Sequence, residues 1–514
     1  MAHRDTWRSA SCWLSLVVLA LSVPLAHAGP ASVGIADTQA EQEQEEEEEE
    51  DALQQRLTER EDRRRPLQPF TVDVAGRPLA LGGEYEIEWE ALWPRERDET
   101  ATRSDRALLL QGLEGEAFYT WGKPLSLFAQ VKLAMEEDLR VGDYEEVSDR
   151  YVERGEMWLY SEDIAGSGIN LDLGRLNFED DRRWWWDRDV DAARVEYEAG
   201  PFDISLAFAR ELGPYRSDRD YVEPEDDRVQ RWIMESSWNW APNHTLQLFA
   251  LRQDDRSRTE ALESVVQHER EDESDARLTW WGARAMGVFE SGGAGAFGYW
   301  FDWARVRGSE RTIDYEALSS RESEVTGIAQ HDVRGHAFDV GLNWLLALAG
   351  EPRLFAGYAR GSGDAAVVDS DGEEVDDGVD HSFRQTSLQA NEAGFGGVQR
   401  FPHYGVLLDP ELSNLRVQTL GAGLTLLRSS SLDLVHHRYR LEQPATSLRE
   451  ARVEPELDGQ HRDLGRAFDL VLALEEWERF EFEAVLSAFR SGDAFVTKPG
   501  VWSYAAFVAM RIAF

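Results

Sequence analysis

Apolar and polar residues alternate in segments along this chain, from Gly83 to its last residue, Phe514. In the final twelve residues, SYAAFVAMRIAF, one face is apolar throughout, whereas the other face admits Arg511. A period of two is typical of a β-strand whose two faces meet different surroundings. A strand at the end of the sequence either closes a barrel, which leaves no free edge, or forms the edge of a soluble sandwich.

The composition favours the barrel. The mean hydropathy of −0.50 and the lack of any run of about 18 apolar residues would, taken alone, indicate a soluble secreted protein. The chain nevertheless contains 19 Trp, 22 Phe and 14 Tyr. In a transmembrane β-barrel every second residue faces a wet lumen, so the hydropathy stays low. The formal net charge of −44 argues against nucleic-acid partners and favours solvated acidic loops.

The connections between the alternating segments differ in length in a regular way. Eight are short, at residues 121–124, 161–168, 199–201, 241–244, 290–295, 349–352, 428–431 and 475–479. Nine are long and charged, near residues 93–106, 138–153, 178–191, 212–229, 253–276, 307–335, 361–413, 441–464 and 490–501. This arrangement predicts an all-β fold, an 18-stranded antiparallel transmembrane β-barrel of the bacterial outer membrane, with short periplasmic turns and long outer loops.

The amino-terminal part divides into two further segments. Residues 1–28 carry a short n-region, an apolar run and an Ala-His-Ala site, which predict a secretory signal peptide; an uncleaved anchor is the alternative. The only cysteine, Cys12, lies there, so no disulfide or cysteine metal site is expected after cleavage. Residues 29–78 include EQEQEEEEEED and predict an acidic, largely disordered periplasmic tail, with a single acidic helix as the alternative. Residues 79–514 are predicted to form the barrel.

One predicted loop combines aromatic and charged side chains. Its candidate polymer-binding residues are Arg182, Arg183, Trp184, Trp185, Trp186 and Asp187. Aromatic faces stack on sugar rings, and arginine pairs with carboxylates in a bidentate way. If the loop folds into the lumen, it can guide a uronic-acid polymer. Alternatively, the tryptophans wedge the loop against the barrel wall or belong to an interfacial aromatic girdle.

Five segments resemble the alginate-export family of outer-membrane β-barrel proteins, over roughly residues 80–514. They are GRLNFEDDRRWWWDRDVDAARVEY (174–197), GYARGSGD (357–364), ELSNLRVQTLGAGL (411–424), DLGRAFDLV (463–471) and SGDAF (491–495). The resemblance implies an 18-stranded, porin-like exporter of an anionic polysaccharide. It also implies that Arg360 and Arg400 face the lumen and attract the polymer, and that Asp493 holds an arginine in place. Ordinary solvation of the two arginines is the alternative.

Alternation along the strand near residue 436 supplies two more candidates. Arg438 and Arg440 share a face with His436, which we predict to be the lumen face. The opposite face, which includes Tyr439, suits lipid.

The strand register predicts a charged cluster at the periplasmic mouth. Its carboxylates are Glu84 and Glu86 on the first strand and Glu481 and Glu483 on the seventeenth. Barrel closure places the last strand between these two, so Arg511 should pair with at least one of the four. The cluster either shapes the access of polymer or only secures closure. Unneutralised glutamates would repel a polyanion, which weakens the argument for alginate itself.

These observations predict a passive, selective pore that exports an exopolysaccharide, most simply an anionic alginate-like polymer. Expected partners are the polysaccharide chain, outer-membrane lipid, the outer-membrane assembly machinery and a periplasmic polysaccharide synthesis and secretion complex; no cofactor, metal or nucleic acid is expected. One alternative is a substrate-selective porin for uptake of small solutes such as sugars or organic acids. Another is an outer-membrane enzyme or adhesin on the same barrel, although no nucleophile–base constellation has convincing spacing.

Overall fold

The structure is a computed structural model that describes residues 70–93, 106–122, 125–140, 148–257, 260–319, 321–364, 367–368, 374–375, 378–395, 397, 400–452, 456–496 and 499–514. The predicted signal peptide and residues 29–69 of the predicted tail lie outside the described residues. Within the described part, no helix is long and apolar enough to cross a membrane.

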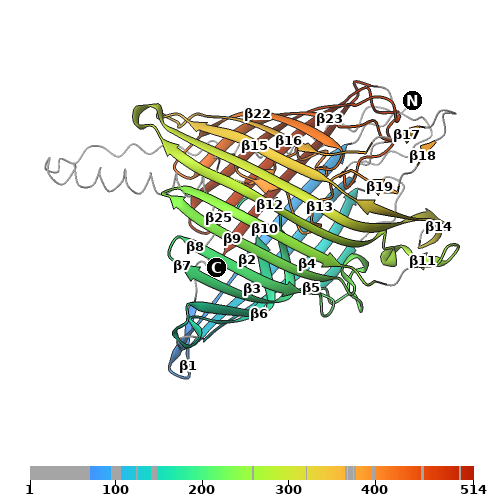
Figure 1. The fold of residues 1–514 in the computed structure, drawn as a ribbon. Coiled ribbons are helices and arrows are strands. Elements are labelled where there is room, and N and C mark those ends of the chain that lie inside the picture. Colours follow the sequence, from blue (N-terminus) through green and yellow to red (C-terminus); the bar gives the residue numbers. More distant parts are fainter. Residues whose placement is uncertain are drawn as a thin grey trace, which may run out of the picture. The chain divides into compact units, whose positions relative to one another are not determined.

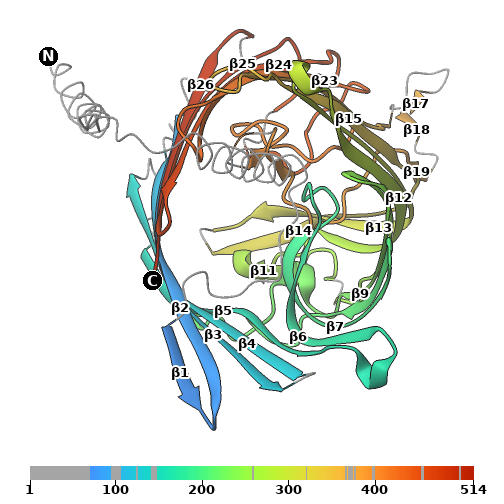
Figure 2. The same ribbon diagram turned by 90° about the vertical axis from the view of Figure 1, so that its left-hand side faces the viewer.

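Eighteen antiparallel strands form a closed ring (Figures 1 and 2). They are β2 (Arg77–Trp93), β3 (Arg106–Gly122), β4 (Leu125–Arg140), β5 (Ser148–Ser161), β6 (Ile169–Glu179), β7 (Asp187–Ala199), β8 (Phe202–Ala209), β9 (Gln230–Ala241), β10 (His244–Asp254), β12 (Ser274–Glu290), β13 (Ala296–Ala317), β15 (His336–Leu345), β16 (Arg353–Gly361), β22 (Leu415–Thr425), β23 (Ser430–Leu441), β24 (Asp463–Trp477), β25 (Phe480–Ser491) and β26 (Trp502–Ala513). Each pairs with the next in this order, and β26 pairs with β2. The predicted fold is confirmed.

The chain end closes the ring through backbone hydrogen bonds. Gly83 N donates to Phe514 O at 3.0 Å, and Phe514 N donates to Gly83 O at 2.9 Å. A Cβ atom at position 83 would lie 2.3 Å from Glu114 O and 2.8 Å from the Phe514 ring, so only glycine fits beneath the terminal aromatic side chain. Because the seam is paired, the barrel has no open edge in lipid.

The short and long connections alternate as predicted, but two boundaries differ. The predicted disordered tail includes residues 70–78, whereas β1 (Phe70–Val74) forms a hairpin with the start of β2. Ala75 and Gly76 both have positive φ, as the two central residues of a type I′ turn require. Residues 307–335 were predicted to be a charged loop, whereas β13 continues to Ala317 and pairs with β14 (Glu322–Val333). Alternation that includes charged residues continues through this hairpin.

Smaller elements lie in the long connections. They are β11 (Val265–Gln267), β17 (Val367–Val368), β18 (Glu374–Val375), β19 (Val379–Asp380), β20 (Glu392–Ala393), β21 (Phe401–Pro402), and the short 3₁₀ turns η1 (Ile164–Gly166), η2 (Pro224–Asp226), η3 (His268–Arg270) and η4 (Gly292–Ala294). β11 extends the hairpin by pairing with β14, and β19 pairs with the end of the same strand.

The two faces of the barrel strands differ in exposure. On β13, Phe297, Phe301 and Trp303 are exposed, whereas Trp300 and Asp302 on the opposite face are buried. The outward positions of other strands are also apolar and exposed, including Leu133, Leu206, Leu248, Leu342, Leu420, Leu434 and Leu486. This apolar outer surface suits lipid.

The orientation of the barrel can be tested by labelling. We expect a cysteine at position 262, in the long connection before β12, to react with an impermeant maleimide on intact cells, because long loops of such barrels face outside. A cysteine at position 291, in the short turn after β12, should react only after permeabilisation. Leu262 and Ser291 are both exposed, so access to the side chain does not distinguish them. The reverse labelling pattern would invert the proposed topology.

Candidate functional site in the lumen

One side of the lumen is filled by the chain itself. Residues 381–395, 397 and 400–414, which we call the lumen loop, belong to the connection between β16 and β22 and lie inside the ring of strands (Figure 2). Their apolar side chains are almost completely buried: Phe383, Leu388, Ala393, Phe395, Phe401, Tyr404, Val406, Leu407, Leu408 and Leu412. All of them except Ala393 pack against inward-facing residues of the barrel wall, in two clusters.

The inward faces of the adjoining strands explain why the lumen loop enters the barrel. On β22 to β25 these faces carry Leu415, Val417, Val435, Tyr439, Leu441, Leu464, Val471 and Val485, each at most 3% exposed. Burial of apolar surface stabilises by about 25 cal/mol per Å². An apolar wall in a wet lumen therefore favours a cover, and the lumen loop provides it.

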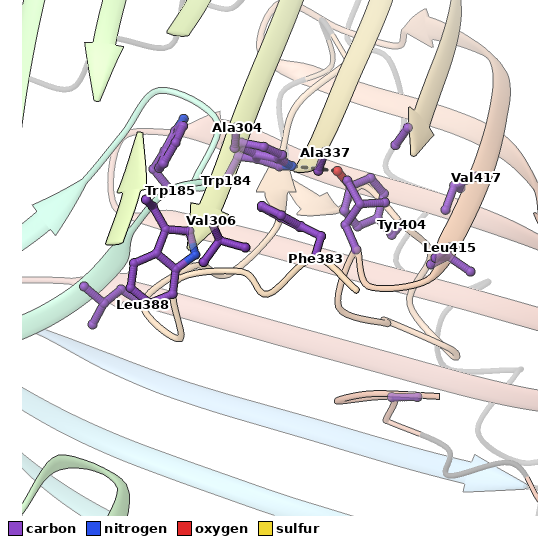
Figure 3. Close-up of a cluster of buried hydrophobic side chains, with 14 of the residues drawn as sticks. Trp184, Trp185, Ala304, Val306, Ala337, Phe383, Leu388, Tyr404, Leu415 and Val417 are labelled. Carbon is purple, nitrogen blue, oxygen red and sulfur yellow. Dashed lines mark hydrogen bonds between the residues drawn. The ribbon is translucent and has the colours of Figure 1, made fainter. Parts of the chain in front are cut away.

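The tryptophan triplet lies where the connection between β6 and β7 meets the lumen loop. Figure 3 shows Trp184 and Trp185 beside Phe383 and Leu388 of that loop. Trp184 Nε1 donates to the hydroxyl of Tyr404 at 2.8 Å, and the Trp184 ring stacks on Phe383 at 6.2 Å. Trp185 stacks on Phe249 of β10 at 4.9 Å. The three tryptophans are 1–2% exposed. They wedge the connection against the wall, and no ring face is free for a sugar in this structure.

A buried cluster of charged residues holds the connection between β6 and β7 in place. Arg284 on β12 is 0% exposed and pairs with Asp180 and with Asp302, the latter at 2.6 Å. The other oxygen of Asp180 accepts hydrogen bonds from the backbone N–H groups of Trp185 and Trp186 at 2.7 and 2.9 Å. Arg284 therefore holds the tryptophan triplet through Asp180.

Asp339 on β15 joins the wall to both internal segments. It accepts hydrogen bonds from Trp300 Nε1 at 2.8 Å, from the hydroxyl of Tyr404 at 2.9 Å and from Arg182 Nη2 at 3.2 Å. Burial raises the pKa of Tyr404 well above its usual value, so its hydroxyl stays protonated and can donate. Arg182 also lies over the ring of Trp300, 4.4 Å from its centroid.

Arg183 and Arg400 lie close to each other but are both paired. Arg183 donates to Glu179 at 2.8 Å and to Glu392 of the lumen loop at 3.0 Å, and it lies 3.3 Å from Asp187. Arg400 pairs with the same Glu179 oxygen. These arginines cross-link the lumen loop to β6 and β7, and their charges are balanced by carboxylates.

The opposite side of the lumen is polar and partly exposed. Inward-facing side chains of β2 to β4 and β26 form what we call the polar wall. It includes Glu84, Glu86, Glu88, Glu114, Glu116, Gln130, Lys132 and Arg511. Lys132 and Arg511 keep 32% and 29% of their side-chain area exposed. Lys132 and Arg511 therefore reach solvent on the inner side of the ring or at its periplasmic mouth.

Arg511 lies among the mouth carboxylates. Its Nε donates to Glu86 at 2.7 Å, and its terminal nitrogens lie 3.8 Å from Glu88 and 3.9 Å from Glu481. Glu84 and Glu483 stand on the two neighbouring strands, opposite Ala513 and Ala509. Lys132, which the sequence analysis did not single out, donates to the second oxygen of Glu86 at 3.0 Å.

The family model described as alginate export matches residues 78–509. The chain belongs to the alginate export family. It is 26% identical over 333 residues to the alginate production protein AlgE of Pseudomonas aeruginosa, which is 64% of this chain and 65% of that protein. It is 22% identical over 348 residues to the protein of the same name from Pseudomonas syringae pv. tomato, with the same shares. The chain thus spans about 65% of the length of both relatives.

Among solved structures, the chain is similar to Acinetobacter baumannii OccAB1, with a TM-score of 0.53 and 8% identity over 84% of this chain and 96% of that chain. This similarity shows the fold alone. Together with the family and the apolar outer surface, it makes the chain a β-barrel of the bacterial outer membrane.

For this member of the alginate export family, the predicted direction of three arginines is wrong. On β23, Tyr439 and Leu441 are 0% exposed and point inward, whereas Arg438 and Arg440 are exposed on the outer face. The inward face is apolar because the lumen loop covers it. Arg360 also points outward, where it donates to Glu442 at 2.9 Å.

Asp493 is exposed in the connection between β25 and β26, and no arginine of the described residues lies within salt-bridge distance of it. Its predicted contact with an arginine is therefore absent there. The prediction from sequence missed four charged residues of this site. Arg284, Asp302 and Asp339 are isolated charges at inward positions of apolar strands, whereas Asp180 stands in the charged run EDDRR at the start of a loop.

The lumen loop contains a carboxyl group that should make its anchoring depend on pH. Burial raises the pKa of Asp409 to about 7, with Glu392 and Asp469 adding to the rise against the opposing charge of Arg452. A carboxyl group whose folded pKa is raised keeps its proton at low pH, so folding is favoured there and weakens as pH rises towards 7.

We therefore expect the amides of residues 404–412 to exchange faster at pH 8 than at pH 5, after correction for intrinsic rates. In Asp409→Asn this extra dependence should disappear. An unchanged profile in the variant would assign the pH dependence to another group.

Proposed function

We propose that the barrel is an outer-membrane pore that exports an exopolysaccharide, of the anionic alginate-like class, by passive and selective conduction. Membership of the alginate export family supports the substrate class. The structural observation that carries the proposal is the division of the lumen into a filled side and a partly exposed polar wall. A passage confined to one wall suits an extended chain, which threads lengthwise.

The charges suggest how selectivity arises in this proposal. The candidate arginines Arg182, Arg183 and Arg400 are neutralised by carboxylates, and Lys132 and Arg511 share Glu86. We therefore attribute polymer recognition to hydrogen bonds between the polar wall and sugar hydroxyl and carboxyl groups, not to a strongly basic lumen. A periplasmic synthesis and secretion complex supplies the driving force, and the barrel performs no catalysis.

The proposal is tested by conductance in planar bilayers. We expect alginate oligomers to block the current at concentrations where uronic-acid monomers have no effect, because only a chain contacts the whole polar wall at once. A neutral glucan of equal length serves as the charge control. Free passage of monomers without any block by oligomers would instead favour uptake of small solutes.

Removal of Arg511 tests the polar wall directly. We expect Arg511→Gln to lower the free energy of unfolding by about 1 kcal/mol, the scale of a partly exposed ion pair, and to shift the reversal potential towards cations because Glu86, Glu88 and Glu481 lose a counter-charge. Arg428→Gln, which removes a charge from a short turn, is the control. A reversal potential equal to that of the control would show that ions do not pass this cluster.

A further inference from the structure

Six arginines lie on the outer surface of one part of the barrel, and none of them faces the lumen. They stand on β16, β22, β23, β24 and β25, which are consecutive in the ring. We call them the arginine belt: Arg360, Arg416, Arg438, Arg440, Arg466 and Arg490. The strand register sets them directly opposite one another in two rows, Arg360–Arg416–Arg440 and Arg438–Arg466–Arg490.

The belt points away from the lumen. On β23 the residues between its arginines, such as Tyr439, are fully buried beneath the lumen loop. Leu434, on the same face as Arg438, is 53% exposed. Side chains at every second position share a face, so the belt continues the lipid-facing surface.

The belt also lies at one level of that surface. Towards the short turns, the same faces carry exposed leucines, namely Leu354, Leu420, Leu434, Leu470 and Leu486. Arg438 follows Leu434 by four residues, about 13 Å along the strand. Towards the long loops, the strands end within a few residues of the belt. The belt therefore marks the edge of the apolar band on the long-loop side, where lipid headgroups lie.

The arginine belt has fewer neighbouring carboxylates than it has arginines, so its positive charge is not balanced by the protein. Glu442 pairs with Arg360 and Arg416, and their hydrogen bonds lower its pKa to about 2. No carboxylate of the described residues lies within 4.0 Å of the guanidinium groups of Arg438, Arg440, Arg466 or Arg490; Asp463, opposite Arg440 in the register, instead accepts from the backbone N–H of Gly465.

Like charges directly opposite each other on neighbouring strands destabilise a sheet. The chain contains 98 acidic and 54 basic residues, so a cationic surface without nearby carboxylates departs from its general composition. An external anion at this level would remove the repulsion. Guanidinium groups bind phosphate in a bidentate way.

We propose that the arginine belt binds the phosphate groups of an anionic glycolipid in the outer leaflet of the outer membrane. The long loops of outer-membrane barrels face outside, which places the belt in that leaflet. A lipid seated there lays its acyl chains on the leucines and its phosphates on the two rows of arginines. The contact fixes the depth of this wall in the membrane, and it is independent of polymer transport.

Binding is measured with the purified full-length protein in a neutral detergent. The probe is diphosphoryl lipid A, and the same lipid without its phosphates tests whether the acyl chains suffice. We expect the variant with Arg438, Arg440, Arg466 and Arg490 all changed to Gln to lose affinity at least about tenfold, the equivalent of one charge-assisted hydrogen bond. The phosphate-free lipid should bind the native protein equally weakly.

The control is Arg428→Gln with Arg479→Gln, two arginines in short turns at the opposite end of the same strands. It should bind lipid A as the native protein does. The double variant Arg438→Gln with Arg466→Gln should lose an intermediate amount of affinity for lipid A. It is used in place of the fourfold variant if the fourfold variant gives no heat-modifiable folded band. Equal binding of the phosphate-free lipid, unchanged affinity in the belt variants, or full competition by equimolar inorganic phosphate would each overturn the proposal.

Discussion

Arg284→Met should destabilise the barrel by about 3–5 kcal/mol, the cost of removing one partner from a buried ion pair. Arg284 and its partners Asp180 and Asp302 are all 0% exposed. Without the guanidinium group, two carboxylates remain in a site that water does not reach. Denaturant unfolding followed by the heat-modifiable band measures the loss. The open-channel current should also become noisier, because Asp180 no longer holds the tryptophan triplet in place.

The matched control lies on the same strand. Arg277 of β12 points outward, is 70% exposed and lies 3.5 Å from Asp254, so Arg277→Met should cost less than about 1 kcal/mol. Adding Asp180→Asn and Asp302→Asn to Arg284→Met should recover part of the lost stability, since it removes the stranded charges. Equal costs for the two arginine variants would mean that Arg284 does not organise the lumen.

The fold was predictable because two independent patterns agree. Alternation identifies strands locally, and the sequence of short and long connections fixes their number and direction. Both patterns depend on neighbouring residues in the chain. Closure of the ring followed from the terminal strand, whose backbone groups need a partner in lipid.

The direction of β23 was not predictable from the same rules. Both of its faces contain apolar residues: Leu434 on one, and Val435 and Tyr439 on the other. The arginine-bearing face is predicted to face the lumen, because a lumen is normally wet. Here the lumen loop, from elsewhere in the chain, covers the inward face with apolar side chains, so the usual polarity is reversed. Because the covering residues are distant in the sequence, nothing in the sequence of β23 itself indicates this reversal.

The buried charges do leave a local signal in the sequence. Asp302 and Asp339 each stand alone among apolar residues, in YWFDWA and AFDVGL. A carboxylate at an inward, apolar position needs a buried partner. Their partners, Arg284 and Arg182, lie in other segments, so the sequence could indicate that such pairs exist but not which residues form them.

Shortening the lumen loop should raise the single-channel conductance severalfold. The change replaces residues 365–410 by a short glycine–serine linker. Arg360 and Arg416 are direct neighbours across β16 and β22, so a hairpin-length connection can join the two strands. The ring of strands keeps all of its pairings, and the variant should still give a folded, heat-modifiable band. Its thermal stability should fall, because inward residues such as Val417 and Tyr439 become exposed to water.

A control variant in which a different connection is shortened distinguishes the effect of emptying the lumen from the effect of shortening any loop. Replacing residues 258–271, between β10 and β12, removes β11 and its contact with β14 but no residue of either large lumen cluster. Conductance in that control should equal that of the native protein. If the lumen-loop variant also conducts like the native protein, ions already pass where the lumen loop lies. The polar wall would then not be the main path, and selection of the polymer along β2 to β4 and β26 would lose its physical basis.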